Sequence, residues 1–317
     1  MKKDESILVA IYCLVYNHES YLRDCFEGFV MQKTNFRFVA VVHDDCSTDN
    51  SVAIIREYAE KYPDIIKPIF EVENQYSKQD GSLDKILQES IYKINTKYVA
   101  FCEGDDYWTD PDKLQKQVDF LEANPQYGMV HTQASVYVQE KNSYGNEIKG
   151  RDVSSFEQLL CNCTIATLTV LIRRELLVQY YDEINPKQYR WLMGDYPLWL
   201  YCATKAKIHF IPEITATYRK LANSASHSSD LRKELRFWES SHNIQLYYAA
   251  KEHVPASLLH KINNEYEELI ICRLIHISRD EALQRLKEAK ELTIQQRLII
   301  YLKIIRMAIL KPLHLAQ

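Results

Sequence analysis

Three carboxylates stand within four residues in the stretch YVAFCEGDDYW: Glu103, Asp105 and Asp106. They directly follow a hydrophobic run with the composition of a buried strand. Hard cations such as Mg²⁺ and Mn²⁺ take carboxylate oxygen ligands and usually keep substrate phosphates as further ligands. Glu103 and Asp105 are two residues apart, so both can face one ion, and Gly104 between them lets the backbone or a ligand approach closely. The stretch therefore has the residues for a metal site.

Polar segments follow four apolar runs of the chain in the same way. They are VYNHES (15–20), HDDCSTDNS (43–51), ENQYSK (73–78) and EGDDYW (103–108). Turns and helix caps explain a single such segment, and we interpret Asp49 as structural, in a turn before a helix. In open α/β sheets, ligands bind outside the carboxyl ends of the strands, so four polar strand ends on one edge favour a ligand cleft.

The sequence limits the kind of phosphate site that this cleft can hold. The chain has only seven glycines and contains neither G-x-G-x-x-G nor G-x-x-x-x-G-K-[ST], the two usual phosphate cradles. A site rich in carboxylates repels a bare phosphate unless a divalent cation lies between them. We therefore expect a diphosphate bridged by Mn²⁺ or Mg²⁺.

The elements that position these segments alternate between strand and helix. Apolar runs predict strands at 7–14, 36–42, 65–70 and 97–102, and helical spacing predicts helices at 19–31, 47–62, 82–94 and 111–123. This alternation predicts an α/β fold with a βαβ-based parallel sheet. Further along, we expect strands at 129–139, 164–172 and 207–211, helices at 154–161, 173–181 and 193–204, and a polar loop at 140–152. Helices at 231–251, 256–277 and 279–301 follow a boundary near residue 225.

The order of the motifs resembles a family 2 glycosyltransferase of the GT-A fold, of the bacterial surface-polysaccharide type. The motifs are YNHE…YLRDC, VVHDDCSTDNS, YVAFCEGDDYWTDPDKLQKQVDFL, GDYPLWL and YR…NSASHS. The resemblance covers roughly residues 5–228 and implies a Rossmann-like mixed sheet flanked by helices. It implies a catalytic domain at 1–228, with a nucleotide-binding half (about 1–127) and an acceptor half (about 128–228), and a helical C-terminal region at 229–317.

The resemblance assigns roles on the donor side. Asp45 matches the acid that holds the base of a nucleotide-sugar, and Asp105 matches the metal ligand of the family's Asp-x-Asp motif. Further donor contacts are expected from Val15, Tyr16, Asn17, Glu19, Glu103 and Gly104. Glu103 replaces the usual first Asp and is one methylene longer, so it can reach the ribose or a metal-bound water instead. The family's arginine-asparagine pair is missing from residues 74–87, which leaves the sugar specificity open.

On the acceptor side, Asp195 in WLMGDYPLWL matches the catalytic base of the family. The local sequence alone leaves this open, because a carboxylate is also favourable at a helix N-terminus. Asp106 is expected near the acceptor or as a helix cap. Trp191 and Tyr196 are expected to stack on sugars, although core packing explains both aromatic residues equally well.

The segment YR…NSASHS supplies further candidates. His227 is the candidate for a second metal ligand, with a solvated loop histidine as the alternative. Arg219 or Lys220 can neutralise diphosphate oxygens.

These roles imply direct displacement at the anomeric carbon, with inversion. Asp195 takes the proton of the acceptor hydroxyl, and the metal held by Asp105 stabilises the departing nucleoside diphosphate. The resemblance implies a hexosyl transfer from a nucleotide-diphospho-sugar, a UDP-sugar in the first place, to a glycan or a lipid-linked acceptor. One alternative is a nucleotidyltransferase, but segment 15–20 lacks the glycines of its loop. The other is a non-catalytic nucleotide-sugar binder, in which Asp105 and Asp195 would have no chemical role.

Bulk composition bounds the partners and the compartment. A net charge of −4 gives no electrostatic grip on nucleic acid, and eight scattered cysteines without a CxxC favour reduced thiols in the cytoplasm. The N-terminus reads as a first strand and not as a signal peptide, and no apolar stretch is long enough to span a membrane. Residues 295–315 mix apolar and basic side chains, which suits either peripheral contact at the inner face of the cell membrane or packing in a homodimer.

Overall fold

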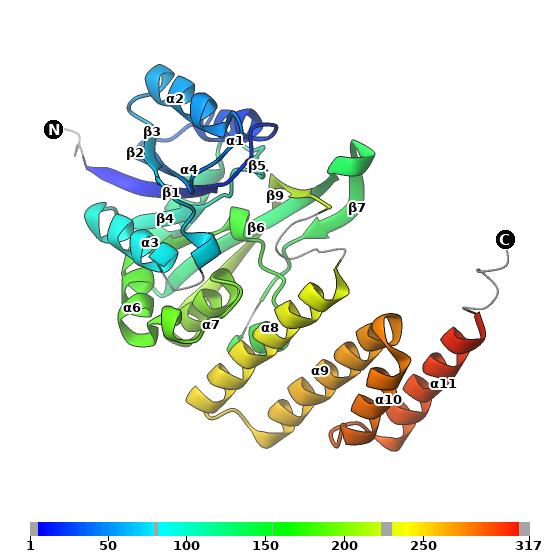
Figure 1. Cartoon of the computed structure of the whole chain (residues 1–317). Helices are drawn as coiled ribbons and strands as arrows, with labels where there is room; N and C mark the ends of the chain where they lie inside the picture. The colour runs from blue at the N-terminus through cyan, green and yellow to red at the C-terminus, as the bar shows by residue number, and fades with distance from the viewer. Residues whose placement is uncertain (1–5, 79–81, 154, 223–229, 311–317) are drawn as a thin grey trace. The chain divides into compact units, whose positions relative to one another are not determined.

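The computed structural model describes residues 6–78, 82–153, 155–222 and 230–310. The chain divides into two compact units, residues 1–190 with 194–221 and residues 191–193 with 222–317. The first unit is a sheet covered by helices and the second unit is helical (Figure 1).

Four parallel strands form one half of the sheet, in the order β3-β2-β1-β4. They are β1 (Ile7–Val15), β2 (Arg37–Asp44), β3 (Ile66–Phe70) and β4 (Tyr98–Phe101). The helices between and after them are α1 (Leu22–Val30), α2 (Ser51–Lys61), α3 (Ser82–Lys93) and α4 (Lys113–Ala123). Helices α1 and α2 cover one face of the sheet (Figure 1). The α/β fold expected from the continuous apolar runs is confirmed.

The other half of the sheet is mixed. It contains β5 (Tyr107–Trp108), β6 (Tyr127–Val138), β7 (Ser143–Lys149), β8 (Leu171–Arg173) and β9 (Lys207–Lys220). Strand β8 is antiparallel to β4 and β6, whereas β6 and β9 run parallel. Helices α5 (Phe156–Cys161), α6 (Arg174–Ile184) and α7 (Asp195–Lys205) complete the unit.

Three expectations for this half were wrong in extent. The region 164–172 is mostly not strand, because β8 begins only at Leu171, and the expected polar loop contains β7. The expected short strand at 207–211 continues to Lys220. Its second part buries threonines rather than aliphatic residues: the hydroxyls of Thr132 and Thr215 lie 2.6 Å apart. Cross-strand hydroxyl pairs of this kind stabilise a sheet, but they leave no apolar pattern in the sequence from which the strand could be predicted.

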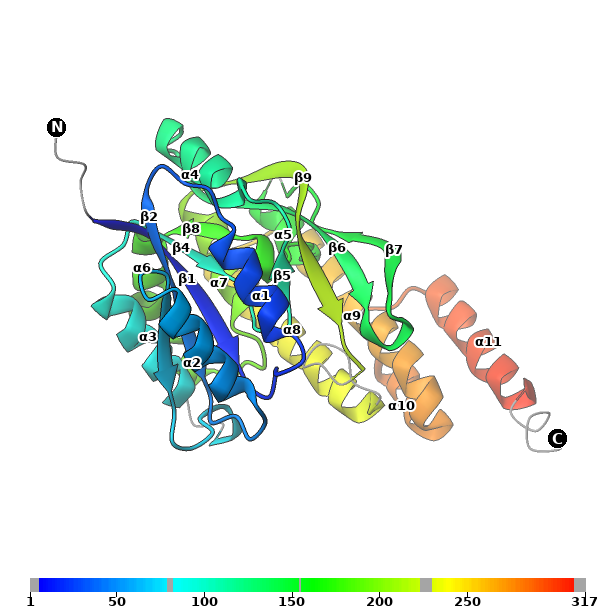
Figure 2. The same cartoon turned by 90° about the horizontal axis from the view of Figure 1, so that it is seen from above.

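Strand β5 fixes the end of the acidic stretch against α1 (Figure 2). A Cβ atom on Gly28 of α1 would lie 2.8 Å from the backbone nitrogen of Trp108, so only glycine permits this approach. The indole of Trp108 is buried, donates a 2.8 Å hydrogen bond to the Leu168 carbonyl and meets Phe29 edge-on. The aromatic residue that follows the acids thus anchors their loop in the core.

The second unit contains α8 (Leu231–Lys251), α9 (Ala256–Ile277), α10 (Arg279–Glu288) and α11 (Ile294–Leu310). A single helix over 279–301 was expected, and this was wrong. The chain breaks after Glu288, and the hydroxyl of Thr293 then accepts a hydrogen bond from the Gln296 amide at the start of α11. Neither Pro nor Gly marks the break, so the sequence signal was weak. None of the helices in the described part of the chain is both long and apolar enough to cross a membrane.

Lys113 is a buried cation beside the anchored loop. Its ammonium lies 4.2 Å from the centre of the Trp108 ring and donates a 2.8 Å hydrogen bond to Gln117. Burial lowers the pKa of Lys113 from 10.5 to about 7, against the opposing charges of Cys102 and Asp110. The folded chain therefore binds fewer protons at this residue than the unfolded chain between these two values.

We expect the free energy of unfolding to rise with pH between about 7 and 10.5 through Lys113, because the charged ammonium is costly to bury. Lys113→Met should show a shallower rise than the wild type in urea unfolding at a series of pH values. Lys93→Met, in which an exposed lysine is lost, serves as the control and should keep the wild-type slope. Equal slopes for Lys113→Met and the wild type would show that burial of this ammonium has no cost.

Candidate active site

The carboxylates of Glu103, Asp105 and Asp106 come together where β4 ends, with one oxygen of each within 4.8 Å of the others. Asp106 is buried and accepts a 2.7 Å hydrogen bond from the backbone amide of Arg219. Asp105 Oδ1 is buried and has no hydrogen-bond partner among the described residues. An unpaired buried carboxylate oxygen is costly unless a cation or a proton satisfies it.

The electrostatics of this cluster also favour a cation. Burial and the neighbouring charge of Asp105 hold the pKa of Asp106 well above its usual range. Glu103 is exposed as a whole residue, but its carboxylate lies among protein atoms. Loss of water around the carboxylate, followed by repulsion from Asp105 and from Asp195, raises the pKa of Glu103 to about 8. A divalent ion would relieve this repulsion and would be coordinated by the unpaired oxygen of Asp105. The residues present therefore fit a Mn²⁺ or Mg²⁺ ion.

Gly104 holds the acids close to the start of α1. A Cβ atom at this position would meet His18 Nδ1 at 2.8 Å and the side chains of Leu22 and Val15 at 3.0 Å. The backbone thus approaches its neighbours as closely as the sequence suggested, although these neighbours are protein side chains. Substitution by alanine would push the acidic loop outward.

A pocket of about 140 Å³ lies beside the cluster, at the carboxyl ends of β1 and β2. It is lined by Leu14, Val15, Tyr16, His18, Asp45, Tyr76, Leu83 and Glu103. The structure therefore brings together four of the residues expected at the donor nucleotide: Val15, Tyr16, Asp45 and Glu103. Tyr16 and Tyr76, which both line the pocket, are also both exposed.

Asp45 lines this pocket and also forms hydrogen bonds with the segment after β3. Its two carboxylate oxygens accept hydrogen bonds from the backbone amides of Gln75 (2.6 Å) and Tyr76 (3.0 Å). Its own carbonyl accepts a bond from the side chain of Asn74. The acid at the end of β2 thus holds the segment after β3, and with it Tyr76, in place.

Asn17 and Glu19, two further residues expected at the donor, link the loop after β1 to the loop after β2. Asn17 Oδ1 accepts from the Thr48 amide at 2.8 Å, and Glu19 Oε2 accepts from the Asn50 amide at 2.8 Å. In return, Asp49 Oδ2 accepts from the Glu19 amide at 3.0 Å, which agrees with a structural interpretation of Asp49. Neither Asn17 nor Glu19 lines the pocket, so their contact with a donor stays a prediction.

Asp195 begins α7, as expected of either a base or a helix-start carboxylate. Its Oδ2 accepts a 2.7 Å hydrogen bond from the hydroxyl of Thr167, and its Oδ1 accepts from the Tyr196 amide. The charge of Asp195 reaches Glu103, whose pKa it helps to raise. The fold therefore gathers two acids that lie 92 positions apart in the sequence.

The remaining acceptor candidates lie in different surroundings. Tyr196 is buried and its hydroxyl donates to the Leu160 carbonyl at 2.9 Å, which favours core packing over sugar stacking. Trp191 belongs to the second unit, where its ring packs edge-on against Tyr247, so its role at the acceptor stays a prediction. His227 lies outside the described residues.

Sequence reasoning missed several residues of the site. Thr167 orients Asp195 but sits in a segment that resembles an ordinary strand. Tyr76 lies in the polar segment ENQYSK, which the sequence pattern assigned to the cleft without singling out this residue. His18 was inside a motif, and its position against Asp105 follows only from the fold; burial lowers its pKa, against the charges of Asp105, Asp49 and Asp44.

Comparison with known sequences identifies the family. The model of glycosyl transferase family 2 matches residues 11–178. An uncharacterized protein of Mycobacterium tuberculosis, Rv1520, is 34% identical over 236 residues, 73% of this chain and 64% of that protein. The chain thus spans less than two thirds of the length of this relative. WfgD of Escherichia coli, named a UDP-Glc:alpha-D-GlcNAc-diphosphoundecaprenol beta-1,3-glucosyltransferase, is 25% identical over 74% of this chain and 85% of its own length.

Solved structures share the fold. The structure of S. aureus TarS 1-349 in complex with UDP-GlcNAc superposes with a TM-score of 0.54 at 14% identity, covering 90% of this chain and 91% of that one. The mannosyltransferase PcManGT from Pyrobaculum calidifontis, in complex with GDP-Man and Mn2+, has a TM-score of 0.55 at 15% identity and covers 98% and 90%. The family model covers more than half of the chain, and its motifs lie at the strand ends where the acids meet. This chain belongs to glycosyl transferase family 2.

Proposed function

We propose that this chain is a metal-dependent, inverting glycosyltransferase. It moves a sugar from a nucleotide-diphospho-sugar to a hydroxyl of a glycan or a lipid-linked acceptor, with residues 1–228 as the catalytic domain. The observation that carries the proposal is the buried oxygen of Asp105, which has no partner among the described residues. It belongs to a cluster of acids in which Glu103 lines the pocket of Asp45 and interacts electrostatically with Asp195.

The donor is a UDP-sugar. A carboxylate at the pocket, here Asp45, accepts hydrogen bonds and so favours a base that offers a ring N–H, as uracil and guanine do. Tyr16, open at the same pocket, supplies an aromatic face for the base. The name of WfgD, a relative that is 25% identical over 74% of this chain, supports uracil as the base.

The acids after β4 hold the metal. Asp105 is the ligand with a free, buried oxygen, and Glu103 lies at the open side, toward the pocket. When bound, Mn²⁺ or Mg²⁺ supplies positive charge to the diphosphate as it departs. Support comes from PcManGT, whose structure contains Mn2+.

Asp195 is the base. Its Oδ2 is oriented by the Thr167 hydroxyl, and α7 fixes its backbone. In this role it takes the proton of the acceptor hydroxyl while the acceptor oxygen attacks the anomeric carbon on the side opposite the diphosphate. One displacement of this kind inverts the anomeric configuration.

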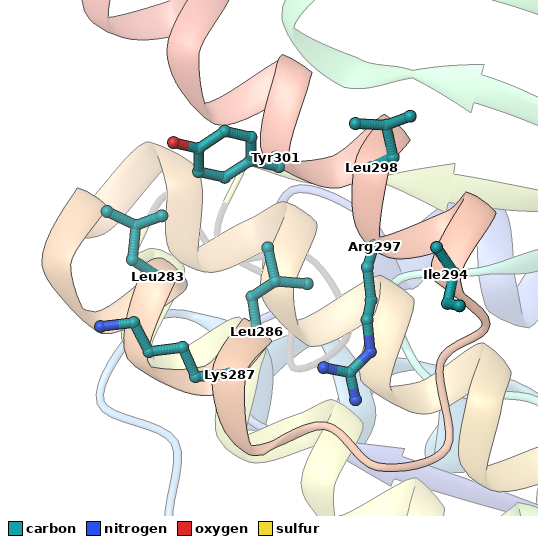
Figure 3. A pocket seen from close by; sticks show the side chains of 7 residues that line it. All are labelled: Leu283, Leu286, Lys287, Ile294, Arg297, Leu298 and Tyr301. Atoms are coloured by element: carbon teal, nitrogen blue, oxygen red, sulfur yellow. The ribbon is translucent and has the colours of Figure 1, made fainter.

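The second unit carries an apolar surface on α10 and α11. Leu283, Leu286, Lys287, Ile294, Arg297, Leu298 and Tyr301 line a groove of about 370 Å³, shown in Figure 3. Helix α11 buries Ile300 and Ile304 in its own unit, while Ile294 is 87% and Leu298 57% exposed. The helix therefore has a second apolar stripe that its own unit does not cover.

The charges around this stripe suit an anionic membrane. The chain contains no Asp or Glu from Leu292 to Leu310, although its net charge is −4. Lys303 and Arg306 are exposed on α11, and Lys287 is exposed at the groove. Basic residues beside an exposed apolar stripe are typical of helices that lie in a membrane interface. We infer peripheral contact with an anionic lipid surface, on the cytoplasmic side where the chain would meet a lipid-linked acceptor.

Asp195→Asn should reduce sugar transfer by about 10²–10⁴-fold, because loss of a general base costs that much. Binding of UDP in the presence of Mn²⁺ should stay close to the wild-type value. Sugar transfer is followed by UDP release and UDP binding by calorimetry, with Asp119→Asn on α4 as a charge-matched control. Full transfer activity in Asp195→Asn would exclude this residue as the base, and no transfer in the wild type with any nucleotide-sugar would favour a binding protein.

Asp105→Asn should weaken UDP binding in Mn²⁺ by about tenfold or more, since even a residue that only supports a metal ligand changes metal affinity by roughly 10–100-fold. In EDTA the variant and the wild type should bind UDP equally. Titration calorimetry under both conditions separates the two effects. Equal binding in Mn²⁺ would remove Asp105 from the metal site.

The wild type should sediment with vesicles made of equal parts phosphatidylcholine and phosphatidylglycerol, and not with phosphatidylcholine alone. Lys303→Glu/Arg306→Glu should weaken binding by at least about 2 kcal/mol, roughly thirtyfold, because each basic residue contributes about 1 kcal/mol at an anionic surface. Leu298→Ser/Leu302→Ser should weaken it as well, and Lys85→Glu/Lys93→Glu on α3 is the charge-matched control. A dimer that Leu298→Ser/Leu302→Ser abolishes, without vesicle binding by the wild type, would assign the surface to self-association instead.

A further inference from the structure

Arg219, near the end of β9, is a buried cation in contact with three segments of the first unit. Its side chain is 6% exposed, and each of its three nitrogen atoms donates to a protein oxygen. The acceptors are the Asp105 carbonyl (2.8 Å), Gln139 Oε1 (2.8 Å) and Asp24 Oδ2 (2.7 Å). This is a different use from the diphosphate contact that the sequence suggested for Arg219.

Two of the bonds of Arg219 reach the acidic loop directly. Nε donates to the carbonyl of Asp105, and the backbone amide donates to Oδ1 of Asp106. Arg219 therefore fixes both the peptide carbonyl of Asp105 and the side chain of Asp106. Asp105 Oδ1 itself has no hydrogen-bond partner in the described part of the chain, so the loop is held in place while this oxygen stays available to another ligand.

Three tyrosine rings enclose the guanidinium. Its central carbon lies 5.0 Å from the ring centre of Tyr21, 5.0 Å from that of Tyr107 and 5.5 Å from that of Tyr137. A planar guanidinium stacks on aromatic faces and donates in several fixed directions at once, which a lysine cannot do. The surroundings thus require arginine in shape as well as in charge.

We infer that Arg219 is a positioning residue that holds the loop of Glu103, Asp105 and Asp106 in its metal-binding arrangement before the metal arrives. The inference rests on the proposed metal site. Without Arg219, the carbonyl of Asp105 and the carboxylate of Asp106 would lose the bonds that fix them, and the ion would have to gather the three acids at the cost of its affinity. Residues that orient metal ligands in this way typically change metal affinity by about 10–100-fold when they are replaced.

The test compares Arg219→Lys and Arg219→Met with the wild type, and Arg23→Met as a control that removes an exposed arginine paired with Glu57. Mn²⁺ affinity is measured by electron paramagnetic resonance without nucleotide. Both Arg219 variants should bind Mn²⁺ about 10–100-fold more weakly, and the lysine variant should not rescue the affinity. In the metal-free protein, amide hydrogen exchange at residues 103–107 should become faster in both variants and stay unchanged in Arg23→Met.

Kinetics separate positioning from a direct catalytic role. The Arg219 variants should require more Mn²⁺ for half-maximal transfer, while kcat at saturating Mn²⁺ changes much less than the metal requirement. If Arg219→Met does not fold, two other single variants test the positioning role. They are Arg219→Lys and Gln139→Ala, the second of which removes one acceptor of the guanidinium.

The outcomes distinguish this inference from the proposed function. Wild-type Mn²⁺ affinity in Arg219→Lys, with unchanged amide exchange, would overturn the positioning role and leave the metal site intact. A wild-type protein that does not bind Mn²⁺ or Mg²⁺ would overturn the proposed metal site itself.

Discussion

Mutual repulsion between three carboxylates at the end of β4 is the constraint around which the first unit is organised. Acids that lie within reach of one ion separate unless their backbone is fixed from outside. Here the supports come from several elements: Gly104 packs against residues 15–22, from the end of β1 to the start of α1, the indole anchor of Trp108 comes from β5 and the bonds of Arg219 come from β9. The cluster therefore depends on tertiary packing, and a peptide with the same local sequence would not keep it.

The same principle extends to the neighbouring loops. The segments after β1 and β2 exchange hydrogen bonds through Asn17, Glu19 and Asp49, and Asp45 ties the segment after β3 to the end of β2. These side chains thus bind backbone amides of the neighbouring loops, and of the four only Asp45 also lines the pocket. A ligand would meet a wall whose polar groups are already oriented, which lowers the entropy that binding has to remove.

Much of this arrangement could be predicted from the sequence. Continuous apolar runs identify the parallel strands, and the carboxyl ends of such strands lie at one edge, so the proximity of Asp45 to the Glu103 loop follows from pattern and topology together. The mixed half of the sheet was harder. Strand β9 pairs buried threonines and β7 is polar along most of its length, so neither has the apolar alternation that usually signals a strand.

The roles of single polar residues were harder still. The sequence does not show that the side chain of Asn17 accepts a hydrogen bond from the Thr48 amide, or that Thr167 donates one to Asp195. Both contacts join residues that are 28 or more positions apart in the chain. The resemblance to a family points to segments that the fold brings to one edge of the sheet, and only the packed structure separates residues that line the pocket from residues that hold the loops around it.

The two bonds from Asp45 to the amides of Gln75 and Tyr76 have an evolutionary consequence. Asp45 and Tyr76 both line the pocket and are linked by a hydrogen bond. A substitution of Asp45 therefore changes the position of Tyr76 as well as the hydrogen bonds that the pocket can form with a ligand. A lineage in which this pocket adapts to a different ligand would therefore need coordinated substitutions at the end of β2 and in residues 74–76. We expect these positions to vary together among descendants of this sequence rather than one at a time.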